Sequence, residues 1–211
     1  MSRPAPTVDP TSAATGQLSP TPSQTVGPFY GYALPFTGGG DLAPPGHPEA
    51  FTLHGRVTDG AGEPVPDALV EVWQPGPDGS RAGAPGSLRR NPVTGETVGR
   101  DSVRFTGFGR VPTDADGHYS VRTLPPGGAP YLALIVFARG LLHHLHTRAY
   151  LPELTDPETE PLLASLEPRR RATLLTTPAA APAPHGPPVR RFDIRLQDDG
   201  VHEETVFLAF D

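Results

Sequence analysis

Cysteine and lysine are both absent from this chain of 211 residues. Without cysteine there are no disulfide bonds, zinc–thiolate sites, iron–sulfur clusters or thiol nucleophiles. All 17 basic residues are arginine, which also excludes Schiff-base chemistry on a lysine. The 23 acidic residues give a net charge of −6. We therefore do not expect binding to nucleic acid, which requires a dense basic surface.

Long apolar runs are lacking as well. The longest unbroken one, Tyr131–Ala138, is far shorter than the roughly 20 residues of a membrane-spanning helix. No basic segment followed by an apolar stretch opens the chain, so no signal peptide is predicted. These features predict a cytoplasmic protein that does not bind membranes.

Proline and glycine are abundant, with 29 and 24 residues, so order has to be judged segment by segment. Residues 1–20 are small, polar and punctuated by proline, and we predict a disordered tail there. Residues 21–50 are interpreted as an arm whose aromatic side chains need a surface, on this domain or on a partner, to pack against. Its proline and glycine residues argue against a regular helix. We expect residues 21–211, arm included, to form a single domain.

The rest of the chain carries an alternation of apolar and polar residues that is typical of half-buried strands. The predicted strands span residues 51–58, 68–73, 119–123, 131–138, 143–151, 189–197 and 206–210. Segment 131–138 is apolar on both faces, as expected of a central strand that is covered on each side. About seven short strands with long connections predict an all-β fold, a β-sandwich.

One short helix and two long loops complete the predicted fold. Thr159 is the expected N-cap residue of the helix, and Pro161 lies in its first turn. Residues 76–104 and 176–188 are interpreted as the loops. Loops of this length inside a compact domain usually serve a function or an interface.

Few residues suggest chemistry by themselves. His144 and His146 share one face of a predicted strand, and such a pair can ligate a metal, although no third ligand is evident nearby. The alternative is an exposed or hydrogen-bonded histidine pair. No nucleophile elbow and no glycine-rich phosphate loop is present, so neither a hydrolytic triad nor a nucleotide site is predicted. Trp73 and Tyr119 are most simply explained as core aromatic residues.

Longer motifs resemble a known family, the intradiol ring-cleavage dioxygenases. The matching segments are T-P-S-Q-T-V-G-P-F-Y at 21–30, L-H-G-R-V-T-D-G-A-G-E-P-V-P-D-A-L-V-E-V-W-Q at 53–74 and G-F-G-R-V-P-T-D-A-D-G-H-Y-S-V-R-T-L-P-P-G at 107–127. F-A-R-G at 137–140 and L-H-T-R-A-Y-L-P-E at 145–153 resemble the alpha chains of its two-chain members. The likeness runs in order from about residue 21 to the end of the chain.

This resemblance implies that the chain binds no metal itself. The family holds a ferric ion with two tyrosinates and a His-x-His pair, ligands that favour Fe(III). The histidine positions fall on Tyr131 and Ala133. The first tyrosine belongs between Trp73 and Phe108, yet residues 33–118 contain no tyrosine. The resemblance therefore implies that Fe(III) is held by a partner beta subunit and that no catalytic residue lies in this chain.

The resemblance also implies which residues reach the partner's substrate pocket. Thr25, Gly27 and Pro28 are placed at that pocket, with Phe29 flanking the aromatic ring. Arg139 is placed as the cation for the carboxylate of a small aromatic substrate, 3,4-dihydroxybenzoate. The implied reaction is O₂-dependent intradiol cleavage to 3-carboxy-cis,cis-muconate by the assembled oxidoreductase, whereas the isolated chain is expected to be inactive.

Other interpretations of these residues remain open at this point. Thr25–Pro28 is, alternatively, only a turn that seats the arm, and Arg139 a surface arginine paired with an acid. For the whole chain, one alternative is a catalytically silent β-sandwich that serves as a scaffold or binding module. Another is a self-sufficient metalloenzyme that uses Tyr131 with His144 and His146. In this chain, however, the histidines follow the Ala-Arg-Gly segment, whereas the family's pair precedes it.

Overall fold

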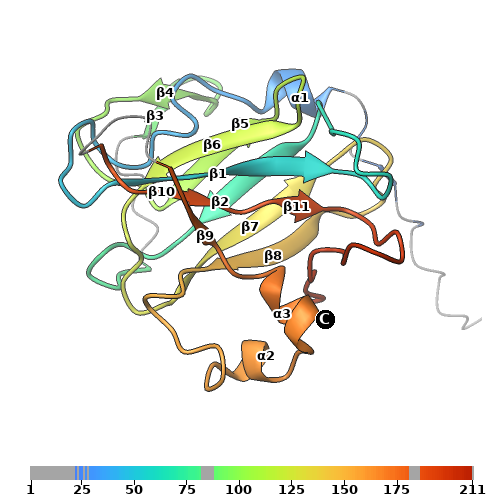
Figure 1. Ribbon diagram of the computed structural model, residues 1–211. Coiled ribbons are helices and arrows are strands. Elements are labelled where there is room, and N and C mark those ends of the chain that lie inside the picture. Colours follow the sequence, from blue (N-terminus) through green and yellow to red (C-terminus); the bar gives the residue numbers. More distant parts are fainter. Residues whose placement is uncertain are drawn as a thin grey trace, which may run out of the picture.

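The computed structural model describes residues 22, 24, 25, 27, 29–81, 88–180 and 186–210. They form two packed β-sheets, which confirms the predicted all-β sandwich (Figure 1). The strands are β1 (Phe51–Thr58), β2 (Leu69–Trp73), β3 (Leu88–Arg90), β4 (Thr97–Arg100), β5 (Phe108–Pro112), β6 (His118–Thr123), β7 (Tyr131–Phe137), β8 (Leu145–Tyr150), β9 (Thr177–Ala179), β10 (Val189–Arg191) and β11 (Ile194–Arg195). The helices are α1 (Tyr30–Ala33), α2 (Pro161–Ala164) and α3 (Pro168–Ala172).

The first sheet is built around β1. This strand pairs with β6 in antiparallel register and with β10 and β11 in parallel register. The predicted strand 189–197 is therefore wrong as one continuous strand. It is interrupted at Phe192 and Asp193, where the Asp193 carboxylate accepts the Arg56 backbone N–H at 3.0 Å in place of a backbone carbonyl. Gly55 is required opposite this break, because a Cβ there would lie 1.8 Å from the Phe192 carbonyl oxygen.

The second sheet has the order β5-β2-β7-β8, and its inner face carries the core. Leu132, Leu134 and Val136 of β7 are fully buried, whereas the alternate residues of the strand are only half-buried. The prediction that this strand is covered on both faces is therefore wrong. Trp73 was also assigned wrongly to the core: it ends β2 on the outer face and is 47% exposed. Tyr119 is buried as predicted, and its hydroxyl donates to the Phe192 carbonyl oxygen at 2.6 Å.

The segments between and after the sheets differ in detail from the prediction. Helix α2 is capped by Glu160 and not by Thr159, because the Glu160 carboxylate accepts the Leu163 backbone N–H at 2.8 Å. The described residues contain two further helices, of which the single turn α1 lies in the arm that was expected to be non-helical. Residues 206–210 form no strand and pair with the sheet only through one bridge, between Leu208 and His146.

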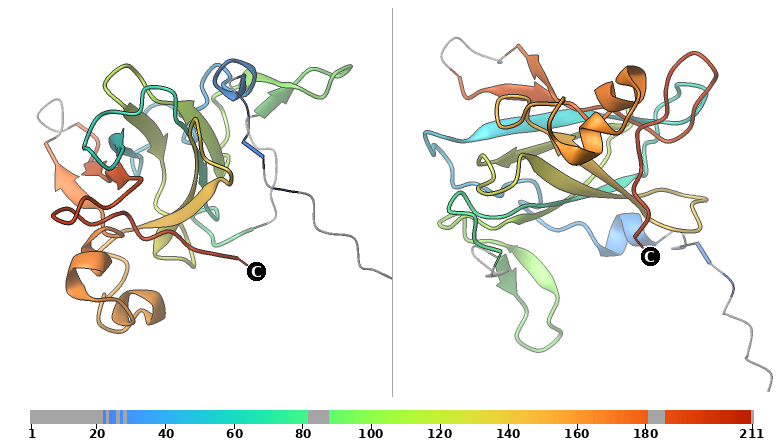
Figure 2. Two further views of the ribbon diagram at one scale, coloured as in Figure 1. Left: turned by 90° about the vertical axis from the view of Figure 1, so that its right-hand side faces the viewer. Right: turned by 90° about the horizontal axis from the view of Figure 1, so that it is seen from below.

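The long segment 76–104, expected to be a loop, contains the β3–β4 hairpin. The two views in Figure 2 show this hairpin projecting from the sandwich on the side opposite α2 and α3. The tail predicted at residues 1–20 lies outside the described residues. No helix in the part of the chain that the structure describes has the length and apolar character that crossing a membrane requires.

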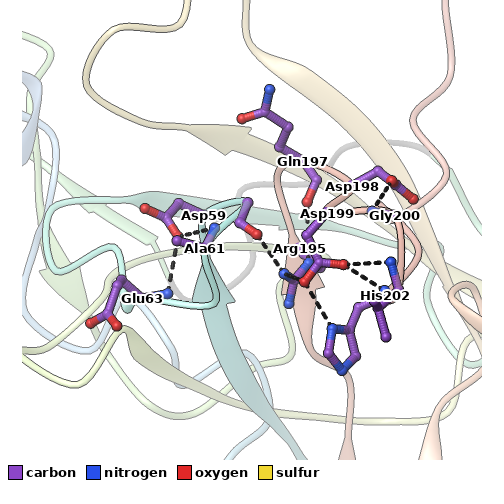
Figure 3. A network of polar contacts seen from close by, with 11 residues as sticks. Asp59, Ala61, Glu63, Arg195, Gln197, Asp198, Asp199, Gly200 and His202 are labelled. Atoms are coloured by element: carbon purple, nitrogen blue, oxygen red, sulfur yellow. Dashed lines mark hydrogen bonds and ion pairs between the residues drawn. The ribbon is translucent and has the colours of Figure 1, made fainter.

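A network of polar contacts ties the loop after β1 to the loop after β11 (Figure 3). The Asp199 carboxylate accepts hydrogen bonds from the backbone N–H and the Nδ1 of His202 and lies 2.8 Å from the Arg195 guanidinium. These donors, the His202 backbone first, hold the pKa of Asp199 well below its usual range. Arg195 in turn donates to the Gly60 carbonyl oxygen at 2.6 Å. The carboxylate is satisfied by its own loop and by Arg195 of β11, so this network is structural.

Candidate functional site

Arg139 lies on the surface just after β7. Its Nε is 2.7 Å from a carboxylate oxygen of Asp67, in the segment before β2. The Arg139 side chain is 75% exposed, so solvent screens the ion pair and its contribution to stability is small. This pairing with an acid is what the alternative interpretation of Arg139 predicted. The contact with Asp67 also orients the exposed guanidinium of Arg139.

Tyr30 links the arm to this ion pair. Its side chain is buried, and its hydroxyl donates a hydrogen bond to the Asp67 carbonyl oxygen. The Arg139 backbone N–H bonds to the same hydroxyl. Burial, and after it the Asp67 carboxylate, raises the pKa of Tyr30, so the phenol stays protonated and keeps its donor hydrogen. The arm is thereby attached to the two segments that carry the ion pair.

The arm docks on its own domain but leaves other aromatic side chains free. Phe36 stacks on Phe108 of β5 with ring centroids 6.4 Å apart, which gives the arm a second attachment point besides Tyr30. Phe29 and Tyr32, in contrast, are 75% and 86% exposed. Exposed aromatic side chains of this kind are typical of surfaces that a partner covers.

The remaining arm residues of the predicted pocket lie just before this docked turn. Thr25 is exposed, and Gly27 has a φ of 75°, a left-handed conformation that favours glycine. Pro28 lies outside the described residues. Phe29 directly precedes the docked Tyr30, and its ring is exposed.

The residues at the two histidine positions of the resemblance do not fit an iron ion. Ala133 has no donor atom, and the Arg148 guanidinium lies 4.3 Å above the centre of the Tyr131 ring, where its charge opposes a bound metal. Burial raises the pKa of the neighbouring Tyr150 to about 12, and its hydroxyl donates to Glu160 at 3.0 Å, so it remains a neutral phenol. Among the described residues, no three His, Cys, Asp or Glu side chains are grouped to hold a metal.

His144 and His146 do not form a site with Tyr131. Their rings pack edge to face with centroids 4.7 Å apart, and each also contacts a phenylalanine ring. In the sheet His146 is paired with Ile135, four residues along β7 from Tyr131. At the strand rise of about 3.3 Å per residue this separation is roughly 13 Å. The histidines therefore belong to an aromatic cluster at the other end of the strand.

A cleft of about 1190 Å³ opens over the start of β7, on the outer face of the second sheet. Its lining includes Trp73, Phe108 and Ala133. Arg139 lies elsewhere, because Tyr131 begins β7 and Arg139 follows its end. A strand of that length measures about 20 Å. The Arg139 surface and the cleft are therefore two separate features of the chain.

Sequence reasoning predicted a pocket role for Arg139 but did not find its partner Asp67 or the docking role of Tyr30. The pairing of Asp67 with Arg139 can be inferred only from the strand register, in which Leu69 of β2 is paired with Phe137 of β7. Residues two positions beyond this pair then meet outside the sheet, and those residues are Asp67 and Arg139. Without the knowledge that β2 neighbours β7, an acid at residue 67 has no predicted partner.

The two packed sheets make this chain an all-β sandwich. Residues 38–153, more than half of the chain, match the family described as Dioxygenase. The chain therefore belongs to the intradiol ring-cleavage dioxygenase family.

Within this family, the chain is similar to the protocatechuate 3,4-dioxygenase alpha chain of Burkholderia cepacia, with 38% identity over 208 residues, 90% of this chain and 97% of the relative. The alpha chain of Pseudomonas putida is 34% identical over 216 residues, which cover 92% of this chain and 98% of the relative. The dioxygenase domain of a dioxygenase–carbohydrate-binding fusion from Streptomyces sp. SirexAA-E shares the fold. It has a TM-score of 0.54 at 24% identity, with 85% of this chain and 99% of that domain covered.

Proposed function

We propose that this chain is the alpha subunit, which binds no iron, of a protocatechuate 3,4-dioxygenase. In the proposed enzyme a beta subunit holds Fe(III), and the assembled pair cleaves protocatechuate (3,4-dihydroxybenzoate) between its two hydroxyl carbons. Both atoms of O₂ enter the product, 3-carboxy-cis,cis-muconate. The similarity to two alpha chains along almost their entire length supports this assignment.

One observation carries the proposal. The positions that correspond to the iron ligands hold an alanine and a tyrosine stacked against an arginine, so the chain has no donor set of its own there. Yet Arg139 and Phe29 are both exposed and lie outside this chain's cleft, and Tyr30, which follows Phe29 in the chain, bonds to the Arg139 backbone. A cation and an aromatic ring that face outward suit a pocket that is completed on another chain.

In the proposed complex Arg139 pairs with the carboxylate of the substrate. A guanidinium presents two parallel N–H donors that match a carboxylate, so it orients the ring as well as attracting the charge. Catechol lacks that carboxylate and would gain nothing from Arg139. Asp67 acts as a positioning residue, because its contact to Nε leaves the terminal nitrogens of the guanidinium for the substrate.

The arm contributes shape to the proposed pocket. Gly27 has no side chain, so its backbone can approach the partner or the substrate closely, and Pro28 stiffens that approach. Thr25 supplies a hydroxyl, and Phe29 supplies a ring face that can flank the substrate. Tyr30 anchors these residues to the domain through its two hydrogen bonds.

Iron content and protocatechuate-dependent O₂ uptake, measured for the full chain alone and co-expressed with its candidate beta subunit, test the proposal. We expect the lone chain to be colourless and inert, and the pair to be red and active. A lone chain that binds iron and turns over would contradict the proposal. An inert pair in which the beta subunit is fully loaded with iron would instead favour the silent scaffold.

Replacing Asp67 with asparagine is expected to raise the KM for protocatechuate about three- to tenfold with kcat and iron content unchanged. The substitution removes the charge that orients Arg139 but keeps the backbone carbonyl that Tyr30 uses. Asp67→Glu should restore part of the affinity. The matched control is Asp101→Asn, which removes another surface ion pair, that with Arg104 at 3.7 Å. If both substitutions have the same effect on KM, Asp67 does not position Arg139.

A further inference from the structure

Glu71 is the only charged residue among the buried residues that the structure describes. It lies in the middle of β2, on the same outer face of the sheet as Trp73. A carboxylate that loses its hydration in this way is costly unless donors replace the water. Oε1 accepts hydrogen bonds from Nε and Nη2 of Arg110 at 2.7 and 2.6 Å, and Oε2 accepts one from Nε1 of Trp73 at 3.2 Å. The buried carboxylate therefore fixes the orientation of the Arg110 guanidinium.

Arg110 of β5 uses its remaining nitrogen on the arm. Nη1 donates to the Leu34 carbonyl oxygen at 3.3 Å, and Leu34 is the C-cap residue of α1. The backbone N–H of Arg110 donates to the Gly39 carbonyl oxygen at 3.0 Å. One residue of the sheet thus holds the arm at two points, and the side-chain contact lies directly after the helical turn.

The other end of this turn carries the contact with the Arg139 surface. Tyr30 begins α1, and its hydroxyl bonds to the Asp67 carbonyl oxygen and to the Arg139 backbone N–H. A helix of a single turn has little stability of its own. Its position is therefore set by the groups that hold its two ends. These are Asp67 and Arg139 at Tyr30, and Arg110 at Leu34.

We infer that Arg110, oriented by Glu71, is a positioning residue for the proposed substrate pocket. It holds the end of α1, and α1 presents Tyr30 to the backbone of Arg139. This inference rests on the proposed function, because it adds two residues to the same site. The role requires a guanidinium, since two of its nitrogens contact the Glu71 carboxylate while the third reaches the arm.

Replacing Arg110 with lysine tests the inference without leaving Glu71 unpaired. The single ammonium group still neutralises the carboxylate but cannot also reach the Leu34 carbonyl oxygen. Hydrogen exchange of the full chain alone, followed by mass spectrometry, measures the protection of the α1 amides. We expect the amides of Ala33 and Leu34, which bond to the carbonyl oxygens of Phe29 and Tyr30, to exchange at least about fivefold faster. Unchanged exchange would overturn the inference.

Arg122→Lys is the matched control. The Arg122 guanidinium also bridges a carboxylate and a backbone carbonyl, those of Asp41 at 3.2 Å and Ala43 at 3.1 Å, but it lies on β6 in the other sheet. This substitution should change the exchange of α1 less than about twofold. An equal effect of the two variants would show a general loosening of the fold and contradict the assigned role.

The co-expressed enzyme provides the second measurement. Arg110→Lys should raise the KM for protocatechuate about three- to tenfold with kcat and iron content unchanged, and should change kcat/KM for catechol less than about twofold. A fall in kcat with both substrates would indicate structural damage and overturn the inference. An unchanged KM in an active enzyme would overturn it as well and leave the proposed function intact. A wild-type pair that is inert although its beta subunit is loaded with iron would instead overturn the proposed function, and the pocket role of Arg110 with it.

Discussion

Replacing Arg139 with alanine is expected to raise the KM of the co-expressed enzyme for protocatechuate about ten- to a hundredfold. The range corresponds to the loss of a hydrogen bond to a charged group, about 1.5–3 kcal/mol. Iron content should not change, because no residue of this chain is proposed as a ligand. Steady-state O₂ uptake and metal analysis of the same preparation measure both quantities.

The effect should depend on the carboxylate of the substrate. With catechol, which has no carboxylate, Arg139→Ala should change kcat/KM less than threefold, so the preference for protocatechuate over catechol falls. Arg104→Ala serves as the matched control, since Arg104 is similarly exposed and is also paired with an aspartate. An unchanged KM for protocatechuate would remove Arg139 from the pocket. An equal loss with catechol would show that the arginine acts on the assembly and not on the carboxylate.

The second large effect concerns the stability of the sandwich. Leu134 on the inner face of β7 is fully buried, and replacing it with alanine should lower the free energy of unfolding by about 2–5 kcal/mol. The cost combines the lost transfer of the side chain out of water with the cavity that remains. Urea unfolding of the full chain, followed by circular dichroism, measures the change.

Ile135 is the matched control for this prediction, because it neighbours Leu134 in the chain but lies on the opposite, half-buried face. Ile135→Ala should cost less than half as much as Leu134→Ala. Equal losses would mean that both faces of β7 are covered in the folded chain, as the sequence pattern had suggested. In that case the outer face would not be open to a partner or to a ligand.

Much of the fold follows from local patterning. Alternation of apolar and polar residues located β1, β2, β6 and β8, and an apolar run located β7, each to within two residues of the strand's ends. The alternation did not predict the break in the strand at 189–197, the β3–β4 hairpin or the absence of a strand at 206–210. Asp193 interrupts the last predicted strand by accepting a backbone N–H, and residues 206–210 are apolar without entering a sheet.

The apolar character of β7 shows why periodicity alone misjudged burial. A strand rich in apolar residues looks the same whether its outer face is covered by its own domain or left half-open. In this chain the tertiary structure determines the burial of the outer face of β7. The strand lies between β2 and β8, and residues on its outer face border the cleft. Trp73 was misplaced for the same reason.

The sequence by itself determined which chemistry this chain lacks and which residues it offers. It has no cysteine, no tyrosine between residues 33 and 118 and no donor at residue 133, and these absences do not depend on the fold. It also singled out Arg139 and the arm through their motifs. Only the tertiary structure decided what these residues meet, because β2 and β7 must pair before Asp67 reaches Arg139. The same pair of strands also places Trp73 beside Ala133, at a distance of about 20 Å along the strands from Asp67 and Arg139. A cleft therefore forms there from residues that are far apart in the sequence.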